Sequence, residues 1–300
     1  ARSVAYRLGM PYYVFNLKDK FAECVIDRFV DAYEHGITPN PCIDCNRYMK
    51  FDKLYQRAEI LGCDHIATGH YARITFENGQ YQLRKALDET KDQRYVLYDL
   101  TQETLARVKF PLGSLRKTEA REIAAEAGLI NARKHDSQDI CFVADGNYAS
   151  LINQLRPKTK PVPGDIVDTS GRVLGRHSGI IRYTVGQRRG LGIGGSGGVL
   201  YVLKIDAGNN RIIVGSKEEL LCRSLRIKDV NWLGEEQPRQ AELTVKLRSR
   251  QAAVPATVVF LEDGWAEITL HEEFYGVAPG QGCCFYDGSR VLGGGIIAAF

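Results

Sequence analysis

The sequence NPCIDCNRYMKFDKLYQRAEILGCDHIATGH, residues 40–70, predicts a helix followed directly by a short strand. From Asn46 onward the apolar residues share one helical face, namely Phe51, Leu54, Tyr55, Ala58 and Leu61. Gly62 stands where a helix commonly ends, and the next run, DHIATGHYA, predicts a strand that leaves into a loop at Gly69. Because helix and strand alternate, we expect a parallel sheet that binds ligands at the carboxyl ends of its strands.

The segments around this stretch continue the alternation. ARSVAYRLGM, residues 1–10, predicts a helix that ends at Gly9, and PYYVFNL, residues 11–17, predicts a strand. TEAREIAAEAGL, residues 118–129, predicts another helix, which Gly128 ends. The first half of the chain is therefore expected to be an α/β domain.

The texture of the sequence changes after about residue 150. Proline and glycine cluster in RPKTKPVPGD, residues 156–165, and short β-type runs follow, separated by turns such as EDG and YDG. We expect a domain boundary at this cluster and antiparallel β-structure beyond it.

Composition excludes a disordered or fibrous chain. The 300 residues are 44% hydrophobic and 25% charged, which leaves room for two or three domains with real cores. The net charge of +4 permits a polyanionic partner without requiring one. No apolar run reaches the roughly 18 residues of a membrane span, and no signal peptide pattern opens the chain. We therefore expect a cytoplasmic protein without a membrane partner.

Cytoplasmic thiols stay reduced, so the cysteines do not predict a disulfide framework. Two of them, Cys42 and Cys45, form a CxxC pair that has three interpretations. Structural zinc needs four ligands, and a second CxxC is absent. A redox pair is conceivable, but TPNP makes a turn before the helix and no thioredoxin-like proline segment is found. The third interpretation is a nucleophile: Cys45 would lie just before a helix that begins near Asn46, where free amides favour a thiolate.

Other polar segments could surround such a nucleophile. ATGHYAR (67–73) places a glycine and a histidine at a strand end, and KDQRYVLY (91–98) joins a polar cluster to an apolar run. HDSQDICF (135–142) puts Cys141 in a polar loop, and RYTVGQRRGLGIGG (182–195) mixes arginines with glycines, which suits phosphate contacts. Each segment alone also fits a satisfied loop, a solvated turn or a buried thiol.

Together these segments resemble the tRNA-specific 2-thiouridylases, the MnmA/TrmU family, over nearly the whole chain. NPCIDCNRYMKF, ATGHYAR, KDQRYVLY, SQDICF, YTVGQRRGLGI, APGQ and LGGGII occur in that family's order and at its approximate spacing. The resemblance implies an α/β plus β fold: a partial PP-loop ATP-pyrophosphatase domain with a parallel sheet (1–150), a small central β-rich domain (151–217) and a C-terminal antiparallel β-barrel (218–300).

The resemblance also implies an activity, the replacement of O2 of the wobble uridine (U34) by sulfur in tRNAs of the Lys, Glu and Gln type. ATP, with Mg²⁺, would adenylate O2 and release pyrophosphate, and AMP would leave when sulfur attacks. Sulfur would come from a persulfide-donating relay protein or a cysteine desulfurase. Cys141 matches the persulfide-carrying cysteine and Cys45 the second catalytic cysteine. Either the persulfide attacks directly or Cys45 first liberates hydrosulfide, and both routes end in a Cys45–Cys141 disulfide.

Further site residues follow from the same resemblance. Gly69 matches a nucleotide-contacting glycine. The segment Asn40, Pro41 and Cys42 matches the one that touches the target base. The expected tRNA contacts are His70, Lys91, Asp92 and Gln93 in the first domain and Arg248, Ser249 and Gln281 in the barrel. Arginines at such positions can neutralise phosphates without reading sequence.

Two departures from the family pattern matter. The family's Ser-Gly-Gly-x-Asp-Ser loop is absent, and GSGGVL (195–200) lacks its Asp and Ser and is expected to be a turn. We therefore expect a chain that lacks the first part of its nucleotide-binding domain and does not form AMP by itself. The second departure is Cys42, which stands where one branch of the family has an aspartate.

The cysteine at this position opens an alternative mechanism. Cys42, Cys45 and Cys141 could hold a 4Fe–4S cluster as in other tRNA thiolases, with one iron open to hydrosulfide. Two rival functions are a non-catalytic RNA-binding module, which leaves the two loop-borne thiols without a use, and another PP-loop enzyme that amidates or ligates small molecules.

Overall fold

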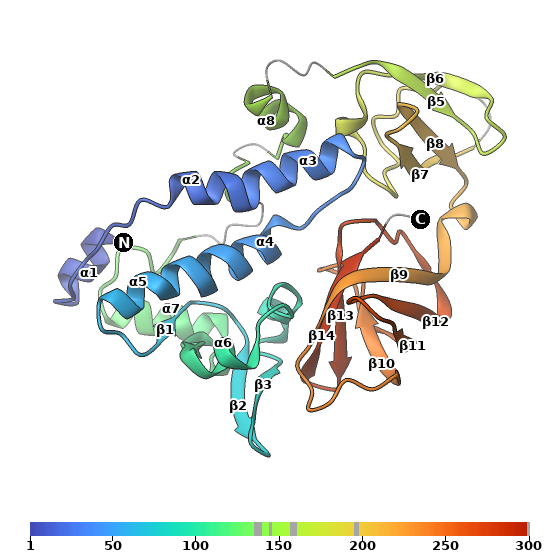
Figure 1. Ribbon diagram of the computed structural model, residues 1–300. Coiled ribbons are helices and arrows are strands. Elements are labelled where there is room, and N and C mark those ends of the chain that lie inside the picture. Colours follow the sequence, from blue (N-terminus) through green and yellow to red (C-terminus); the bar gives the residue numbers. More distant parts are fainter. Residues whose placement is uncertain (135–139, 144–145, 157–160, 195–197, 299–300) are drawn as a thin grey trace.

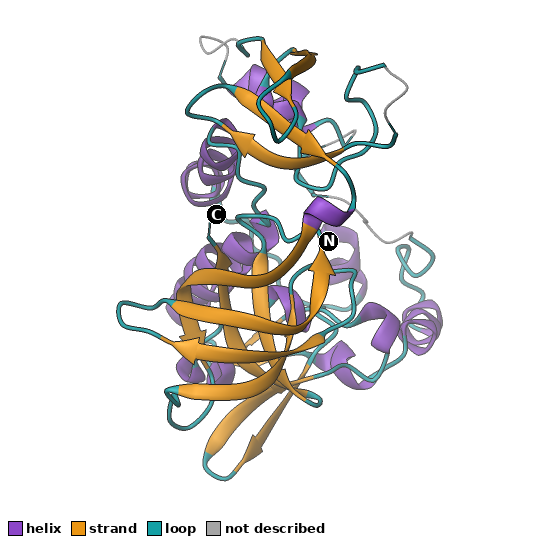
Figure 2. Ribbon diagram, turned by 90° about the vertical axis from the view of Figure 1, so that its right-hand side faces the viewer, coloured by secondary structure: helices purple, strands orange, loops and turns teal. Residues whose placement is uncertain are grey.

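The computed structural model describes residues 1–134, 140–143, 146–156, 161–194 and 198–298. Three regions follow one another along the chain: a helix-rich first region, a small four-stranded sheet and a β-barrel (Figure 1). The small sheet lies above the barrel in Figure 2.

Short helices dominate the first region. Their bounds are α1 (Arg2–Arg7), α2 (Lys18–Phe21), α3 (Arg28–Glu34), α4 (Pro41–Asp44), α5 (Leu54–Ile60), α6 (Gln102–Arg107), α7 (Lys117–Glu126) and α8 (Tyr148–Leu155). The π-helical segment Ala22–Asp27 joins α2 to α3, and the π-helical segment Cys45–Lys53 joins α4 to α5, so each pair runs as one helix (Figure 1). Among the described residues, no helix is long and apolar enough to cross a membrane.

The predicted helix ends are confirmed. Gly9, Gly62 and Gly128 each follow a helix with φ near +65° to +71°, the left-handed conformation that glycine adopts without strain. The strand predicted at residues 11–17 is wrong, because this segment is irregular and exposes Val14 to 71%. A strand depends on a partner for its backbone groups, and within the described residues this segment pairs with none.

The parallel sheet of the first region is small in the part of the chain that the structure describes. It pairs β1 (Ile66–Ala67) with β4 (Val108–Lys109) in parallel. A hairpin of β2 (Arg73–Glu77) and β3 (Gln80–Arg84) follows the loop after β1. Gly69 therefore does lie beyond the carboxyl end of a parallel strand, as the sequence predicts.

The central sheet has the order β6-β5-β8-β7, and its strands are β5 (Gly164–Val167), β6 (Val173–His177), β7 (Tyr201–Asp206) and β8 (Arg211–Gly215). The prediction of antiparallel structure holds for two of its three pairings, whereas β5 and β8 run parallel. Alternate residues such as Ile166, Val202 and Ile212 are fully buried and form its core.

The third region is a closed barrel of antiparallel strands. In chain order they are β9 (Leu221–Trp232), β10 (Gln240–Lys246), β11 (Val254–Phe260), β12 (Ala266–Tyr275), β13 (Gly282–Asp287) and β14 (Arg290–Ile297). The pairing β13–β14 closes the ring, which leaves the barrel without a free edge (Figure 2). The β2–β3 hairpin joins the same sheet where Arg84 pairs with Arg290.

Two tyrosines anchor the first region on the barrel. The hydroxyl of Tyr95 donates to the carbonyl of Gly282 at 2.8 Å, and that of Tyr98 to the carbonyl of Gly295 at 3.2 Å. Both side chains are at least 98% buried in a core that the two regions share. The apolar end of KDQRYVLY is thus an interface between regions, and this interface fixes where the polar start of the motif lies.

Candidate active site

Two helix cysteines and one loop cysteine lie close enough to act on one another electrostatically. Cys42 and Cys45 lie in the first two turns of the α4 helix, and Cys141 lies in the turn 140–143. Desolvation raises the pKa of Cys42, although this residue is exposed at the surface, and that of the half-buried Cys45, and negative charge at Cys141 raises both pKa values further. All three thiols are free. The structure therefore places Cys45 and Cys141, the two cysteines that were predicted to be catalytic, within range of each other's charge.

The helix begins earlier than the sequence analysis predicts. Pro41 occupies the first turn, and the side-chain oxygen of Asn40 accepts from the amide of Cys42 at 3.2 Å as an N-cap. The amide of Cys45 is already bonded within the helix, so the expectation that free helix amides favour its thiolate is wrong. Any stabilisation of that thiolate has to come from a side chain.

Lys50 is the cation whose charge acts on both helix thiols. It lowers the pKa of both Cys42 and Cys45, against the effect of burial. Its Nζ donates to Oδ1 of Asn46 at 3.0 Å and lies 3.5 Å from Nε2 of His70. Sequence reasoning missed Lys50, although its spacing of four positions from Asn46 on a helix is a usable signal.

His70 is buried rather than displayed. Its ring packs between Phe51 and Phe110, with centroids 5.8 and 5.6 Å away, and its Nδ1 lies 2.7 Å from Oγ1 of Thr68. Burial, and then the charge of Lys50, lower the pKa of His70 to about 4, so the ring is neutral at pH 7. The role of His70 as a tRNA contact stays a prediction, and the structure shows the ring buried beside Lys50.

A cleft of about 1010 Å³ collects other predicted residues. Lys91, Asp92 and Gln93 from the first region line it together with Ser249 from the barrel, and Gly69 lies at its margin. Cationic side chains that were not predicted complete the wall, namely Lys85, Arg94, Lys117, Lys246 and Arg250. Asp92 is held by Arg94 at 2.9 Å. Two distant parts of the chain thus build one surface that suits a polyanion.

Arg248 and Gln281 lie at contacts between regions. Arg248 is half-buried and donates from Nη2 to the carbonyl of Val185 at 3.1 Å, and burial lowers its pKa. Gln281 donates from Nε2 to the carbonyl of Thr38 at 2.8 Å, just before the Asn40 cap. Both side chains position neighbouring backbone here, and their contacts with tRNA stay predictions.

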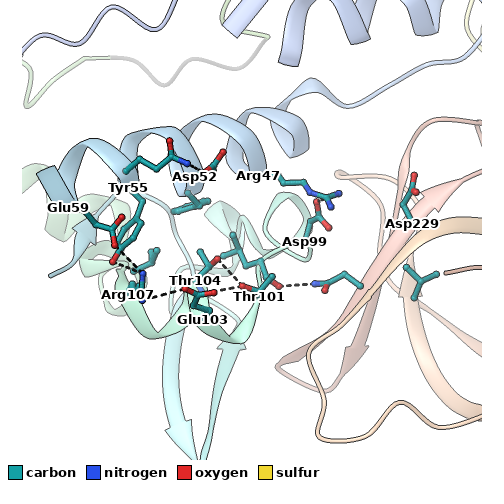
Figure 3. A pocket seen from close by; sticks show the side chains of 16 residues that line it. Arg47, Asp52, Tyr55, Glu59, Asp99, Thr101, Glu103, Thr104, Arg107 and Asp229 are labelled. Atoms are coloured by element: carbon teal, nitrogen blue, oxygen red, sulfur yellow. Dashed lines mark hydrogen bonds and ion pairs between the residues drawn. The ribbon is translucent and has the colours of Figure 1, made fainter. Parts of the chain in front are cut away.

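A second cavity, of about 690 Å³, lies between the α4–α5 helix, α6 and the barrel (Figure 3). Arg47 pairs with Asp99 at 3.0 Å inside it, and Arg107 pairs with Glu59 at 3.4 Å. Burial raises the pKa of Asp99 to about 6, although Arg47 opposes the shift. None of the predicted site residues lines this cavity.

His, Cys, Asp and Glu are the side chains that most often bind metal ions in proteins. Throughout the described ranges, no three of them are arranged to hold a metal ion. The alternative in which Cys42, Cys45 and Cys141 hold a 4Fe–4S cluster therefore gains no support from their arrangement.

The three regions match three family models. Residues 1–145 match a tRNA methyl transferase HUP domain, residues 152–216 a tRNA methyl transferase PRC-barrel domain, and residues 222–297 an aminomethyltransferase β-barrel domain. The fold and the thiol site thus define a HUP-domain protein that carries a PRC-barrel and a C-terminal β-barrel.

Relatives align over nearly all of the chain. The tRNA-specific 2-thiouridylase MnmA of Rhodospirillum centenum is 47% identical over 304 residues, which cover 99% of this chain and 77% of the relative. The enzymes of the same name from Zymomonas mobilis and Paracoccus denitrificans are each 48% identical over 99% of this chain, and the alignments cover 78% and 77% of them. The chain belongs to the tRNA-specific 2-thiouridylase family, which confirms the resemblance seen in the sequence.

Proposed function

We propose that this protein replaces O2 of the wobble uridine of tRNA by sulfur, with ATP as the activating substrate. One observation carries the proposal: Cys45 and Cys141 are far apart in the sequence but lie on segments that pack on the same helix. Phe142 packs on Phe29 at 5.4 Å, Arg28 pairs with Asp44 at 3.4 Å, and charge at Cys141 raises the pKa of Cys45. The names of two of the matching family models refer to methyl transfer. The relatives that align with 99% of the chain are named for thiolation, and sulfur transfer gives both thiols a use.

The proposed reaction first makes the oxygen a leaving group. O2 of the uridine attacks the α-phosphate of ATP, an O2–adenylate forms and pyrophosphate departs. The outer sulfur of a persulfide on Cys141 then attacks C2, and AMP leaves with the bonding electrons. The intermediate is a disulfide between the base and Cys141.

Cys45 completes the transfer. Its thiolate attacks the sulfur of Cys141, the bond to the base-linked sulfur breaks, and that sulfur keeps the electron pair as 2-thiouridine. A Cys45–Cys141 disulfide remains, and an external dithiol returns two electrons to it. If Cys45 instead attacks the persulfide first, hydrosulfide is released and attacks C2, with the same final products.

The nucleotide contact that this chain offers is Gly69. A Cβ at this position would meet only Leu112 Cδ1, at 3.6 Å, so open space lies beside the backbone where a nucleotide could approach. Because no described group of side chains is arranged for a metal, we assign no protein ligands to Mg²⁺ and derive no step through it. The comparisons give no support to the expectation that this chain alone is inactive.

The cation-lined cleft is the surface we propose for tRNA of the Lys, Glu and Gln type. Lys246 and Arg250 from the barrel face the same cleft as Lys91 from the first region, so both regions would contact one backbone. A persulfide-donating relay protein or cysteine desulfurase would load Cys141, which is exposed. Such a partner needs an accessible thiol.

Product identification tests this proposal. The full-length protein is incubated with ATP, a tRNA that carries uridine at the wobble position, and a cysteine desulfurase with cysteine as sulfur donor. We expect 2-thiouridine in the digested tRNA by mass spectrometry and, without reductant, a Cys45–Cys141 disulfide in the protein. A methylated nucleoside formed with a methyl donor, and no thiolated product, would reject the proposal in favour of methyl transfer.

The cluster alternative has its own test, the variant Cys42→Ser. If Cys42 only contacts the base, the thiolation rate should fall by no more than a few-fold, without a change in bound iron. A cluster ligand behaves differently, because its loss removes one of three protein thiolates. Iron in anaerobically purified wild type, lost together with activity in the variant, would establish the cluster.

A further inference from the structure

Lys50 lies on the thiol-bearing face of the helix. It follows Cys45 by five positions and Asn46 by four, within the π-helical segment Cys45–Lys53. The i→i+5 bonding of a π-helix brings residues at these spacings close together, and helical side chains lean toward the N-terminal end. The side chain of Lys50 therefore reaches back toward the thiols.

A network of neutral groups fixes the ammonium. Lys50 donates to Asn46 at 3.0 Å, and the amide of Asn46 in turn donates to the carbonyl of Val96 at 2.8 Å. On the other side His70 lies 3.5 Å away, itself held by Thr68 at 2.7 Å. Because these partners are neutral, they hold the ammonium in place without cancelling its charge.

Among the charges that act on the two helix thiols, Lys50 is the positive one. Burial raises the pKa of Cys42, and Cys45 and Cys141 raise it further. Burial also raises the pKa of Cys45, with Cys141 and Asp44 adding to the rise. Lys50 is the one described cation that lowers both pKa values, and His70 is neutral beside it. Lys50 thus opposes the rise of the pKa at Cys45, and its hydrogen bond to Asn46, one turn back on the same helix, holds its charge on this side.

We propose that Lys50 is a positioning residue of the thiol site: its fixed ammonium stabilises negative charge on Cys45 and attracts anionic sulfur species to it. This inference rests on the proposed function, in which Cys45 acts as a thiolate. A hydrosulfide ion or a persulfide anion would meet the same positive charge. The helix amides cannot serve this purpose, since Cys45 is already inside the helix.

Charge-selective alkylation tests the proposal. Cys45 is alkylated at one pH with neutral iodoacetamide or anionic iodoacetate, and fragment mass spectrometry gives the rate at Cys45 separately from Cys42. A neighbouring cation favours the anionic reagent. We expect Lys50→Met to lower the iodoacetate-to-iodoacetamide rate ratio roughly fivefold, and Lys50→Arg to keep it near the wild-type value.

The matched control is Lys53→Met on the same helix. Lys53 lies three positions further along this helix and pairs with Asp52 at 3.2 Å, so a carboxylate offsets its charge. Its ratio should equal that of wild type. An unchanged rate ratio in Lys50→Met would overturn the proposal. A rate ratio that falls as far in Lys50→Arg as in Lys50→Met would also overturn it, because a purely structural role of Lys50 would then explain both results.

The assay needs no tRNA, ATP or sulfur donor. A protein that shows the expected ratios but makes no 2-thiouridine would reject the proposed function and leave the role of Lys50 standing. If the protein thiolates tRNA but the iodoacetate-to-iodoacetamide rate ratio is the same in wild type and Lys50→Met, the proposed function stands and the role of Lys50 is rejected.

Discussion

The thiol site, formed by Cys42, Cys45, Cys141 and Lys50, and the cation-lined cleft differ in how far apart their residues lie in the sequence. Apart from Cys141, the thiol site comes from one helix, where Asn40, Cys45 and Lys50 lie within a few turns. The cleft joins residues near 91 with residues near 250, and no local element connects them. Its geometry therefore depends on how the first region packs against the barrel.

That packing is tight around Tyr98. The ring fills the space beside Gly294, and the amide of Asn231 donates to the carbonyls of Tyr98 and Leu100, each at 2.8 Å. A change at this interface should disturb the cleft first, whereas a change on the helix should disturb the thiols alone. Variants that separate the two effects test whether the sites are built independently.

The largest effect is expected from the thiols. Cys45→Ser and Cys141→Ser should each lower thiolation by at least roughly 100-fold, because a hydroxyl carries no persulfide and is a poor nucleophile toward sulfur. Binding of tRNA, measured by filter retention, should stay within a few-fold of wild type. The control is Cys63→Ser, an exposed thiol beyond the end of α5. Substantial activity in either serine variant would remove that cysteine from the mechanism.

Packing at the interface comes next. In Gly294→Ala the new Cβ would lie 2.8 Å from the Tyr98 ring and also press on the carbonyl of Cys283. Overpacking of this kind costs about 1–3 kcal/mol of unfolding free energy, measurable by urea denaturation, and tRNA binding should weaken with it. The control is Gly194→Ala, where a Cβ meets nothing within 4 Å. If the Gly294 variant changed Cys45 alkylation more than tRNA binding, the two sites would not be separable.

The parts predicted from sequence are those that short-range signals determine. The helix after Phe51 and the glycines that end helices depend on neighbours a few positions away, and the structure confirms them, although α5 buries none of its residues. The helix start was misplaced because Asn40-Pro41 was interpreted as a turn, although an N-cap followed by proline is also a start signal.

Long-range features escaped the sequence analysis. The segment 11–17 has strand-like composition, but a strand exists only with a partner, and composition does not report one. The cleft was not predicted for the same reason, since Lys246 and Arg250 join Lys91 in one cleft only after the barrel packs against the first region. Positions 135–139 of HDSQDICF and 195–197 of GSGGVL lie outside the described residues.

Acid should destabilise the thiol site through His70. Its pKa is lowered from 6.5 to about 4 by burial, so the unfolded chain binds a proton at a higher pH than the folded one. Stability from the neutral ring is complete above pH 6.5 and is lost as pH falls toward 4. A shift of the His70 pKa from 6.5 to about 4 limits this loss of unfolding free energy to about 3 kcal/mol, since one pKa unit corresponds to about 1.4 kcal/mol.

The variant His70→Gln tests this pH-dependent contribution to the unfolding free energy. It cannot take up the proton, so its unfolding free energy should fall less steeply than that of wild type between pH 7 and pH 4 in urea titrations. His65→Gln replaces an exposed histidine on the same segment and should keep the wild-type slope. Parallel slopes for wild type and His70→Gln would show that the histidine is not buried as a neutral ring.

The smallest effect is expected from single cations of the cleft, and two neighbouring arginines give a matched comparison. Arg250 is exposed and lines the cleft, whereas Arg248 is half-buried and bonds to the carbonyl of Val185. One lost phosphate contact lowers the slope of log K against log salt by roughly one. Arg250→Ala should therefore weaken tRNA binding a few-fold at low salt and flatten the slope, with unchanged stability.

Arg248→Ala should lower the unfolding free energy, because it removes a hydrogen bond between regions. If Arg248→Ala flattens the slope at unchanged stability and Arg250→Ala does not, the tRNA path runs over the contact between regions and not through the cleft.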